Sequence, residues 1–140
     1  MAKLSYLPAL EDANAPLSDK QLEILEEQVE SEMPNPSIQS QFNYAWGLIK
    51  CSSKKQNKKG IDLLVDIFKN CPQRRRECLY YLSVGCLKIN DLSEAKRYID
   101  ALVNHEPDNL QAAQLQRVVE DKIAKGKYQI CSKYIYDLGI

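Results

Sequence analysis

The chain has 140 residues, of which 44% are hydrophobic and 27% charged, a composition typical of one globular domain and not of a disordered or fibrous chain. Its 19 basic residues balance its 19 acidic residues, so no net field attracts a phosphate backbone and we expect no nucleic-acid partner. The five cysteines lack framework spacing, the N-terminus lacks the apolar run of a secretory signal, and no window has the roughly 20 apolar residues of a membrane span. We therefore expect a protein of a reducing, cytosol-facing compartment.

The N-terminal segment, residues 1–17, is predicted to be an arm outside the helical body. It contains Pro8 and Pro16 and shows no sustained 3.6-residue period. It nevertheless carries apolar side chains that could dock onto the body, namely Leu4, Tyr6, Leu7 and Leu10. We expect the arm to cover part of the helical domain.

The first helix is predicted to begin after Ser18, because Gln21 stands three residues later in the spacing of a capping box. Pro34 and Pro36 must end this helix, since proline cannot donate to the helical ladder. A second helix begins near Ser37. Its apolar residues have the helical spacing of a buried stripe: Ile38, Phe42, Ala45, Trp46 and Ile49.

A lysine-rich stretch follows and is predicted to be a solvated loop, although a basic recognition patch is the alternative. Its lysines are Lys54, Lys55, Lys58 and Lys59, with no aromatic residue between them. A third helix is expected over residues 60–70, with Pro72 as its stop.

Three more helices are expected in the second half of the chain. The fourth spans residues 74–89, the fifth runs from Ser93 as its cap to residue 105, and the sixth runs from a cap at residue 108 or 109 to a stop at Gly126. The chain is thus expected to hold a helical domain over residues 18–126 and a tail over residues 127–140.

An internal repeat is visible in the spacing of small residues and prolines. Pro72 and Pro107 are 35 residues apart, as are Gly60 and Ala95. One residue of slack in the lysine-rich stretch then aligns Tyr44 with Tyr80 and Gly47 with Ser83. Two antiparallel helices per repeat, with small residues at their crossing and a closing proline, resemble the tetratricopeptide pattern. The repeat positions are Gly47, Gly60, Pro72, Ser83, Ala95 and Pro107.

The expected fold is an all-α, six-helix bundle with two tandem tetratricopeptide-like pairs, capped by the first and last helices. The first helix of each pair should line a concave groove able to hold a helical or extended partner segment. Groove positions fall on residues of the second and fourth helices: Gln41, Tyr44, Leu48, Cys51, Glu77, Tyr80, Val84, Leu87 and Lys88. Several are apolar, which favours a covered patch.

Longer strings resemble the mitochondrial fission 1 protein family, most closely its fungal members. They are IQSQFNYAWGLIK from Ile38 and RRRECLYYL from Arg74, supported by QLEIL, AKRY and VEDKI. The resemblance covers about residues 3–125.

The resemblance implies a non-enzymatic adaptor in mitochondrial and peroxisomal fission, on the cytosolic face of the outer mitochondrial membrane and on peroxisomes. Its implied partners are a WD40-type fission adaptor protein, whose helical segment binds the groove, and a dynamin-related GTPase that is recruited. Carried over to this sequence, the binding residues are Tyr44, Leu48, Glu77, Leu79, Tyr80, Val84 and Leu87. Family members have a C-terminal membrane anchor, which we expect to be absent from this chain because the segment after Lys125 is short and polar.

Catalytic and metal-binding motifs are sparse, so we expect neither an enzyme nor a cofactor. His105 suits the end of a helix dipole, and the pair of Cys78 and Cys86 has no further ligands for zinc. The run 74–76 of three arginines could contact an acidic partner or form ordinary salt bridges. An alternative function is a chaperone-type clamp for peptide C-termini, but among the groove positions only Lys88 is cationic.

Overall fold

The protein is all-helical throughout the part that the computed structural model describes, residues 13 and 15–137, with side chains to residue 126. The α-helices there are α1 (Asp19–Ser31), α2 (Ile38–Lys50), α3 (Lys54–Asn70), α4 (Arg75–Lys88), α5 (Leu92–His105) and α6 (Leu110–Asp137), with one 3₁₀ turn, η2 (Pro72–Arg74). The prediction of an all-α fold with six helices is confirmed.

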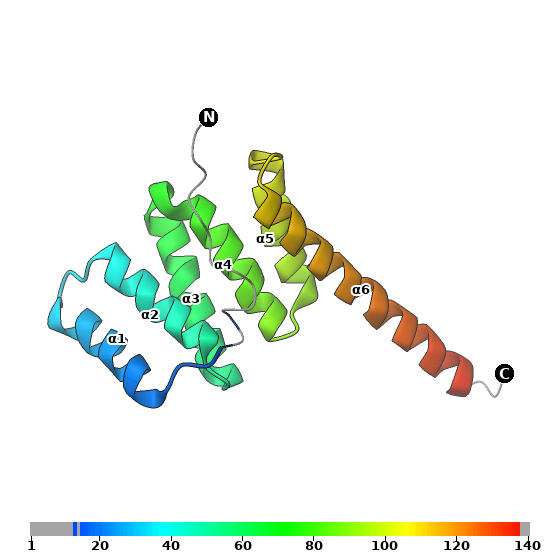
Figure 1. The fold of residues 1–140 in the computed structure, drawn as a ribbon, viewed down its shortest axis with the longest axis horizontal. Helices are drawn as coiled ribbons and strands as arrows, with labels where there is room; N and C mark the ends of the chain where they lie inside the picture. The colour runs from blue at the N-terminus through cyan, green and yellow to red at the C-terminus, as the bar shows by residue number, and fades with distance from the viewer. Residues whose placement is uncertain (1–12, 14, 138–140) are drawn as a thin grey trace.

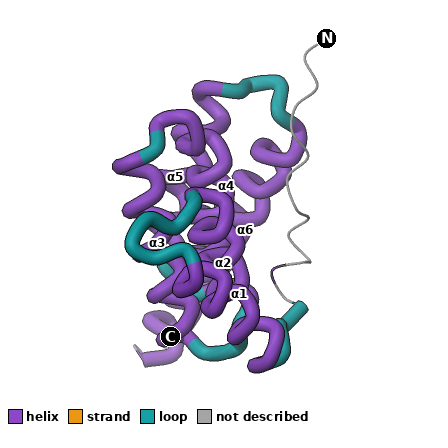
Figure 2. Tube along the Cα trace, turned by 90° about the vertical axis from the view of Figure 1, so that its left-hand side faces the viewer, coloured by secondary structure: helices purple, strands orange, loops and turns teal. Residues whose placement is uncertain are grey.

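Successive helices lie side by side, each packed against the next along the chain (Figure 1). Turned by 90°, the fold has α3 and α5 on one side and α2 and α4 beside them on the other (Figure 2). The pairs α2–α3 and α4–α5 are therefore the two tandem units. Helix α1 covers α2, and α6 packs on α5 before its C-terminal part extends away from the body (Figure 1).

The lysine-rich stretch is helical, so its prediction as a loop was wrong. Helix α3 begins at Lys54, six residues before the predicted start. The buried Asn57 explains this early start, because its Nδ2 lies 2.9–3.0 Å from the carbonyl oxygens of Leu48, Ile49 and Cys51 at the end of α2. These contacts satisfy carbonyls that a helix end leaves unpaired and fix the turn between the two helices.

Two further boundaries differ from the prediction. Helix α5 begins at Leu92 with Asp91 as its cap, where Ser93 was expected. Helix α6 has the predicted cap at Asn109, whose Oδ1 accepts from the Ala112 N–H at 3.1 Å, but it continues past the predicted stop at Gly126 to Asp137. No proline follows Gly126, and a glycine alone weakens a helix without ending it.

The helix crossings correct the predicted repeat register. Ser83 Oγ donates to the Ala95 carbonyl oxygen at 2.8 Å, as the spacing of small residues requires. In the first pair, a Cβ placed on Gly60 would lie 3.0 Å from Leu48 Cβ, so Leu48 stands where Ser83 stands in the second pair. Gly47 instead faces α1, where an added Cβ would meet Leu25 Cδ1 at 2.7 Å. Corresponding positions of the two helix pairs are therefore 35 residues apart on the first helix as well as on the second, with no extra residue in the lysine-rich stretch.

The turn between α1 and α2 depends on the Glu32 carboxylate. Its oxygens accept from the Ser37 N–H at 2.8 Å, the Ser40 hydroxyl at 2.6 Å and the Gln28 amide at 2.6 Å. These hydrogen bonds, led by Ser40, lower the pKa of Glu32 to about 2 from an ordinary value of 4.5. The ionised carboxylate is therefore the form that stabilises this turn.

Removing the Glu32 carboxylate should change how the free energy of unfolding depends on pH. Because the folded pKa is depressed, the contribution is complete above pH 4.5 and is lost as the pH falls toward about 2. We expect urea midpoints at pH 6 and pH 3 to differ less in Glu32→Gln than in the wild type. Ser40→Ala, which removes one hydrogen bond, should be intermediate. An unchanged pH dependence in both variants would contradict this role for Glu32.

Candidate partner-binding groove

One buried apolar cluster joins α4 to α5, α6 and Ala13, and it includes one face of α4. Tyr80, Val84 and Leu87 are spaced i, i+4, i+7, so they project from the same side of the helix. All three are buried in one cluster with Ala13, and Trp46 of α2 packs against that cluster. We call Trp46, Tyr80, Val84, Leu87 and Lys88 the groove residues.

Lys88 ties three segments together at one end of this groove. Its Nζ donates to the carbonyl oxygens of Ala13 and Ile49, each at 2.7 Å. Ile49 belongs to the last turn of α2, and Ala13 precedes α1 and is only 2% exposed. Burial lowers the pKa of Lys88. The chain before α1 is thus held against α4 by a hydrogen bond as well as by apolar contact.

Four of the predicted groove positions, Gln41, Tyr44, Leu48 and Cys51, lie elsewhere. Tyr44 and Leu48 are buried in a separate cluster with Leu22 of α1 and Cys51. The Tyr44 hydroxyl accepts from Lys59 Nζ at 3.1 Å, and Gln41 Nε2 donates to the Pro36 carbonyl oxygen at 3.0 Å. Without the assumed slack, the α2 positions that correspond to Tyr80 and Val84 are Ala45 and Ile49, and both are buried in the core between α2, α3 and α4.

Leu79 and Glu77 are two further residues of α4 that were expected to bind the partner. Their surroundings differ from each other. Leu79 lines a cavity together with Phe68 of α3 and Leu102 of α5. Glu77 accepts from Arg74 Nη1 at 3.0 Å, and its side chain is 27% exposed. Glu77 is therefore available at the surface, whereas Leu79 is buried in the same cluster as Tyr80 and also lines this cavity.

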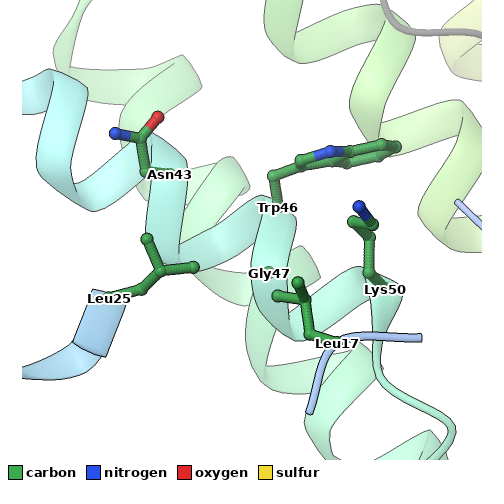
Figure 3. Close-up of a pocket in the computed structure, with 6 residues that line it drawn as sticks. All are labelled: Leu17, Leu25, Asn43, Trp46, Gly47 and Lys50. Atoms are coloured by element: carbon green, nitrogen blue, oxygen red, sulfur yellow. The ribbon is translucent and has the colours of Figure 1, made fainter. Parts of the chain in front are cut away.

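Trp46 is the groove residue that sequence reasoning assigned only to the core stripe. Its ring lies 4.8 Å from that of Tyr81, centroid to centroid. Trp46 also lines a pocket of about 220 Å³ with Leu17, Leu25, Asn43, Gly47 and Lys50, where Leu17, Leu25 and Trp46 surround Gly47 (Figure 3). The 35-residue spacing without slack pairs Trp46 with Tyr81, whereas Tyr80 and Val84 correspond to Ala45 and Ile49, so the repeat does not single out Trp46.

The three consecutive arginines make intramolecular contacts. Arg74 bonds Glu77 and, through Nη2, the Gln39 side chain at 2.9 Å. Arg75 Nε donates to the Phe68 carbonyl oxygen at 2.9 Å, and Arg76 forms a salt bridge with Glu106. Each of the three guanidinium groups thus forms at least one hydrogen bond or ion pair within the chain.

The described residues contain no group of three or more His, Cys, Asp or Glu that could hold a metal ion. Burial raises the pKa of both Cys78 and Cys86 to about 12, which suits their place as small apolar side chains in the core. No helix among the described residues is both long enough and apolar enough to cross a membrane.

Comparison with known proteins gives matches over most of the chain. The model of the Fis1 N-terminal tetratricopeptide repeat matches residues 39–70, and that of the Fis1 C-terminal repeat matches residues 76–128. Mitochondrial fission 1 protein of Kluyveromyces lactis is 54% identical over 124 residues, which are 88% of this chain and 80% of that protein. The Saccharomyces cerevisiae protein is 52% identical over 126 residues, 89% of this chain and 81% of its own.

Solved structures agree with this relationship. The crystal structure of the fission protein Fis1 from Saccharomyces cerevisiae superposes with a TM-score of 0.86 at 50% identity, over 90% of this chain and 98% of that one. Yeast Fis1 in complex with an Mdv1 fragment gives a TM-score of 0.85 at 51% identity, over 89% of this chain and 99% of that one. Yeast Fis1 complexed with a Caf4 fragment gives 0.67 at 52% identity, over 69% of this chain and 99% of that one.

The Fis1 repeats match the tandem pairs α2–α3 and α4–α5, and the yeast structures share the whole helical body. The chain therefore belongs to the mitochondrial fission 1 protein family, whose members are tetratricopeptide-like adaptors and not enzymes.

Proposed function

We propose that this protein binds a helical segment of a WD40-type fission adaptor in the groove between α2 and α4 and thereby recruits a dynamin-related GTPase. It acts at the cytosolic face of the outer mitochondrial membrane and of peroxisomes. The observation that carries the proposal is that Tyr80, Val84 and Leu87, on one face of α4, share a buried apolar cluster with Ala13, which precedes α1. The relatives solved with Mdv1 and Caf4 fragments support an adaptor as the partner.

The chemistry of the groove favours capture of an apolar helix face over capture of a peptide C-terminus. A carboxylate clamp needs several cationic or amide side chains that are free to meet the ligand. Lys88 already donates to the carbonyl oxygens of Ala13 and Ile49. Its neighbours in the groove are the aromatic and aliphatic side chains that anchor amphipathic helices.

The groove assignment is tested by comparing two buried tyrosines. Tyr80 is 3% exposed and lies in the groove cluster, whereas Tyr44 is 7% exposed and lies in the cluster beneath α1. We expect Tyr80→Ala to weaken binding of the adaptor fragment at least tenfold, or about 1.4 kcal/mol. Tyr44→Ala should keep affinity within about threefold. Isothermal titration calorimetry with a purified adaptor fragment measures both.

Stability serves as the internal control, because both changes remove a buried aromatic ring and should lower the free energy of unfolding by about 3 kcal/mol. Titrations are run at a temperature where circular dichroism shows both variants folded. Equal loss of affinity in the two variants would place the contact outside the groove. Unchanged affinity in folded Tyr80→Ala would overturn the proposal.

A further inference from the structure

A second hollow lies where the end of α3, the start of α4 and the end of α5 meet. Its volume is about 510 Å³, within the range of about 300–1,000 Å³ that is usual for small-ligand sites. None of the groove residues lines it. Leu79 of α4 lines this hollow and is also buried in the same cluster as its neighbour Tyr80.

The lining combines an apolar part with a charged part. Phe68, Leu79 and Leu102 supply the apolar surface, and Arg75, Arg76, His105 and Glu106 supply the polar atoms. Two guanidinium groups face a single carboxylate, so the fixed charge of the lining is positive. An apolar wall beside a few convergent polar groups is the usual design of a ligand pocket.

The Arg76 guanidinium has hydrogen-bonding capacity that the fold does not use. Its Nε bonds Glu106 Oε2 at 2.5 Å, which shows that a carboxylate fits at this position. Its Nη2 is buried and has no hydrogen-bond partner among the residues that the structure describes. A buried donor without a partner destabilises the fold, so a ligand that supplies an acceptor would recover the lost free energy.

Arg75 is the second cation in the lining, and because it is exposed it lies at the rim of the hollow. Its guanidinium lies 5.2 Å from the centroid of the Phe68 ring, and its Nε donates to the Phe68 carbonyl oxygen. These contacts hold the cation beside the apolar part of the lining. A negatively charged group that entered would thus meet two guanidinium groups, those of Arg75 and Arg76.

We propose that this hollow binds a carboxylate joined to an apolar group. The carboxylate accepts hydrogen bonds from Arg76, which it shares with Glu106, and is attracted by Arg75. The apolar group packs on Phe68, Leu79 and Leu102. The same chemistry is present in a short-chain carboxylic acid and in an acidic residue flanked by apolar ones in a peptide.

The first test titrates the ¹⁵N-labelled full chain with three probes: hexanoate, hexanol and acetate. We expect hexanoate to shift the backbone amide signals of residues around the hollow, such as Arg76 and Leu102. Hexanol has the apolar chain without the carboxylate, and acetate has the carboxylate without the long apolar chain. Both should bind at least tenfold more weakly than hexanoate. No shift with hexanoate, or equal binding of hexanol, would overturn the proposal.

Variants separate a built site from general attraction by surface charge. The double change Arg76→Gln/Glu106→Gln removes the ion pair without leaving one charge unpaired, and Arg75→Gln removes only the rim cation. Both should weaken hexanoate binding at least fivefold while the NMR spectrum stays that of the folded chain. Arg97→Gln is the matched control, because Arg97 is an exposed arginine paired with Glu94 on α5 and does not line the hollow. Equal weakening by the control would contradict a specific site.

A further probe, the peptide acetyl-leucyl-glutamyl-leucine amide, distinguishes the two sources of the ligand. Binding at least tenfold tighter than hexanoate would identify a protein segment, and weaker binding would identify a free carboxylic acid. The experiment does not use the groove, so its outcome is independent of the Tyr80 titration.

Discussion

Gly60→Ala is expected to lower the free energy of unfolding by about 3 kcal/mol, and the melting temperature by roughly 10 °C. Gly60 is buried within α3 where this helix crosses α2. An added Cβ would lie 2.7 Å from the Ala45 carbonyl oxygen and 3.0 Å from both Leu48 Cβ and Ile49 Cγ1. The nearest of these atoms belongs to the backbone of a packed helix, so the two helices must move apart to relieve the overlap.

The matched control is Gly126→Ala, which should raise stability. Gly126 also lies within a helix, but an added Cβ there has no atom within 4 Å. Alanine exceeds glycine in helix propensity by about 1 kcal/mol, so the two identical substitutions should have opposite signs. Thermal and urea unfolding of both variants, followed by circular dichroism, measures the difference. A stabilising Gly60→Ala would show that the crossing tolerates a larger separation than the structure has.

Features encoded by neighbours in the sequence could be predicted correctly. Ser18 and Gln21 form the expected capping box, with hydrogen bonds of 3.2 and 3.0 Å. Ser83 meets Ala95 at the expected crossing, and the prolines at 72 and 107 follow the ends of α3 and α5. These signals depend on local backbone chemistry, which the residue types themselves determine.

The errors arose where tertiary contacts override local preference. Four lysines near the start of α3 oppose the helix dipole, and Ser53 makes no side-chain cap, so the stretch has the local character of a loop. Asn57 reverses this by contacting the end of α2, a partner that composition cannot reveal. Because the stretch was predicted to be a loop, an extra residue could be placed in it when the two repeats were aligned, and the structure shows that this extra residue is not needed.

The structure brings together the apolar candidate residues expected on α4 but not those expected on α2. On α4, the i, i+4, i+7 spacing within the repeat pattern selected Tyr80, Val84 and Leu87, which are buried in one cluster. On α2, the extra residue assumed in the repeat aligned Tyr44 with Tyr80 and Leu48 with Val84, and both are buried in a separate cluster with Leu22. Helical periodicity identifies which residues share a face, but the neighbouring helix decides what that face contacts.

Lys88→Met should release the chain at Ala13 from α4 and destabilise the protein by about 2 kcal/mol. Methionine keeps much of the side-chain volume but cannot donate to the Ala13 and Ile49 carbonyl oxygens, both of which lie 2.7 Å from Lys88 Nζ. Hydrogen exchange should therefore become faster at the amides between residue 15 and the start of α1. Urea unfolding measures the accompanying loss of stability.

The comparison with Lys96→Met separates this role from the loss of any lysine. Lys96 pairs with Asp100 and Glu120 at the surface, where its side chain is 41% exposed, so its removal should cost less than about 1 kcal/mol and leave exchange before α1 unchanged. Slow exchange in Lys88→Met would mean that apolar burial of Ala13 alone holds the segment. Fast exchange would show that the hydrogen bonds of one ammonium group, that of Lys88, hold the described residues before α1 in place.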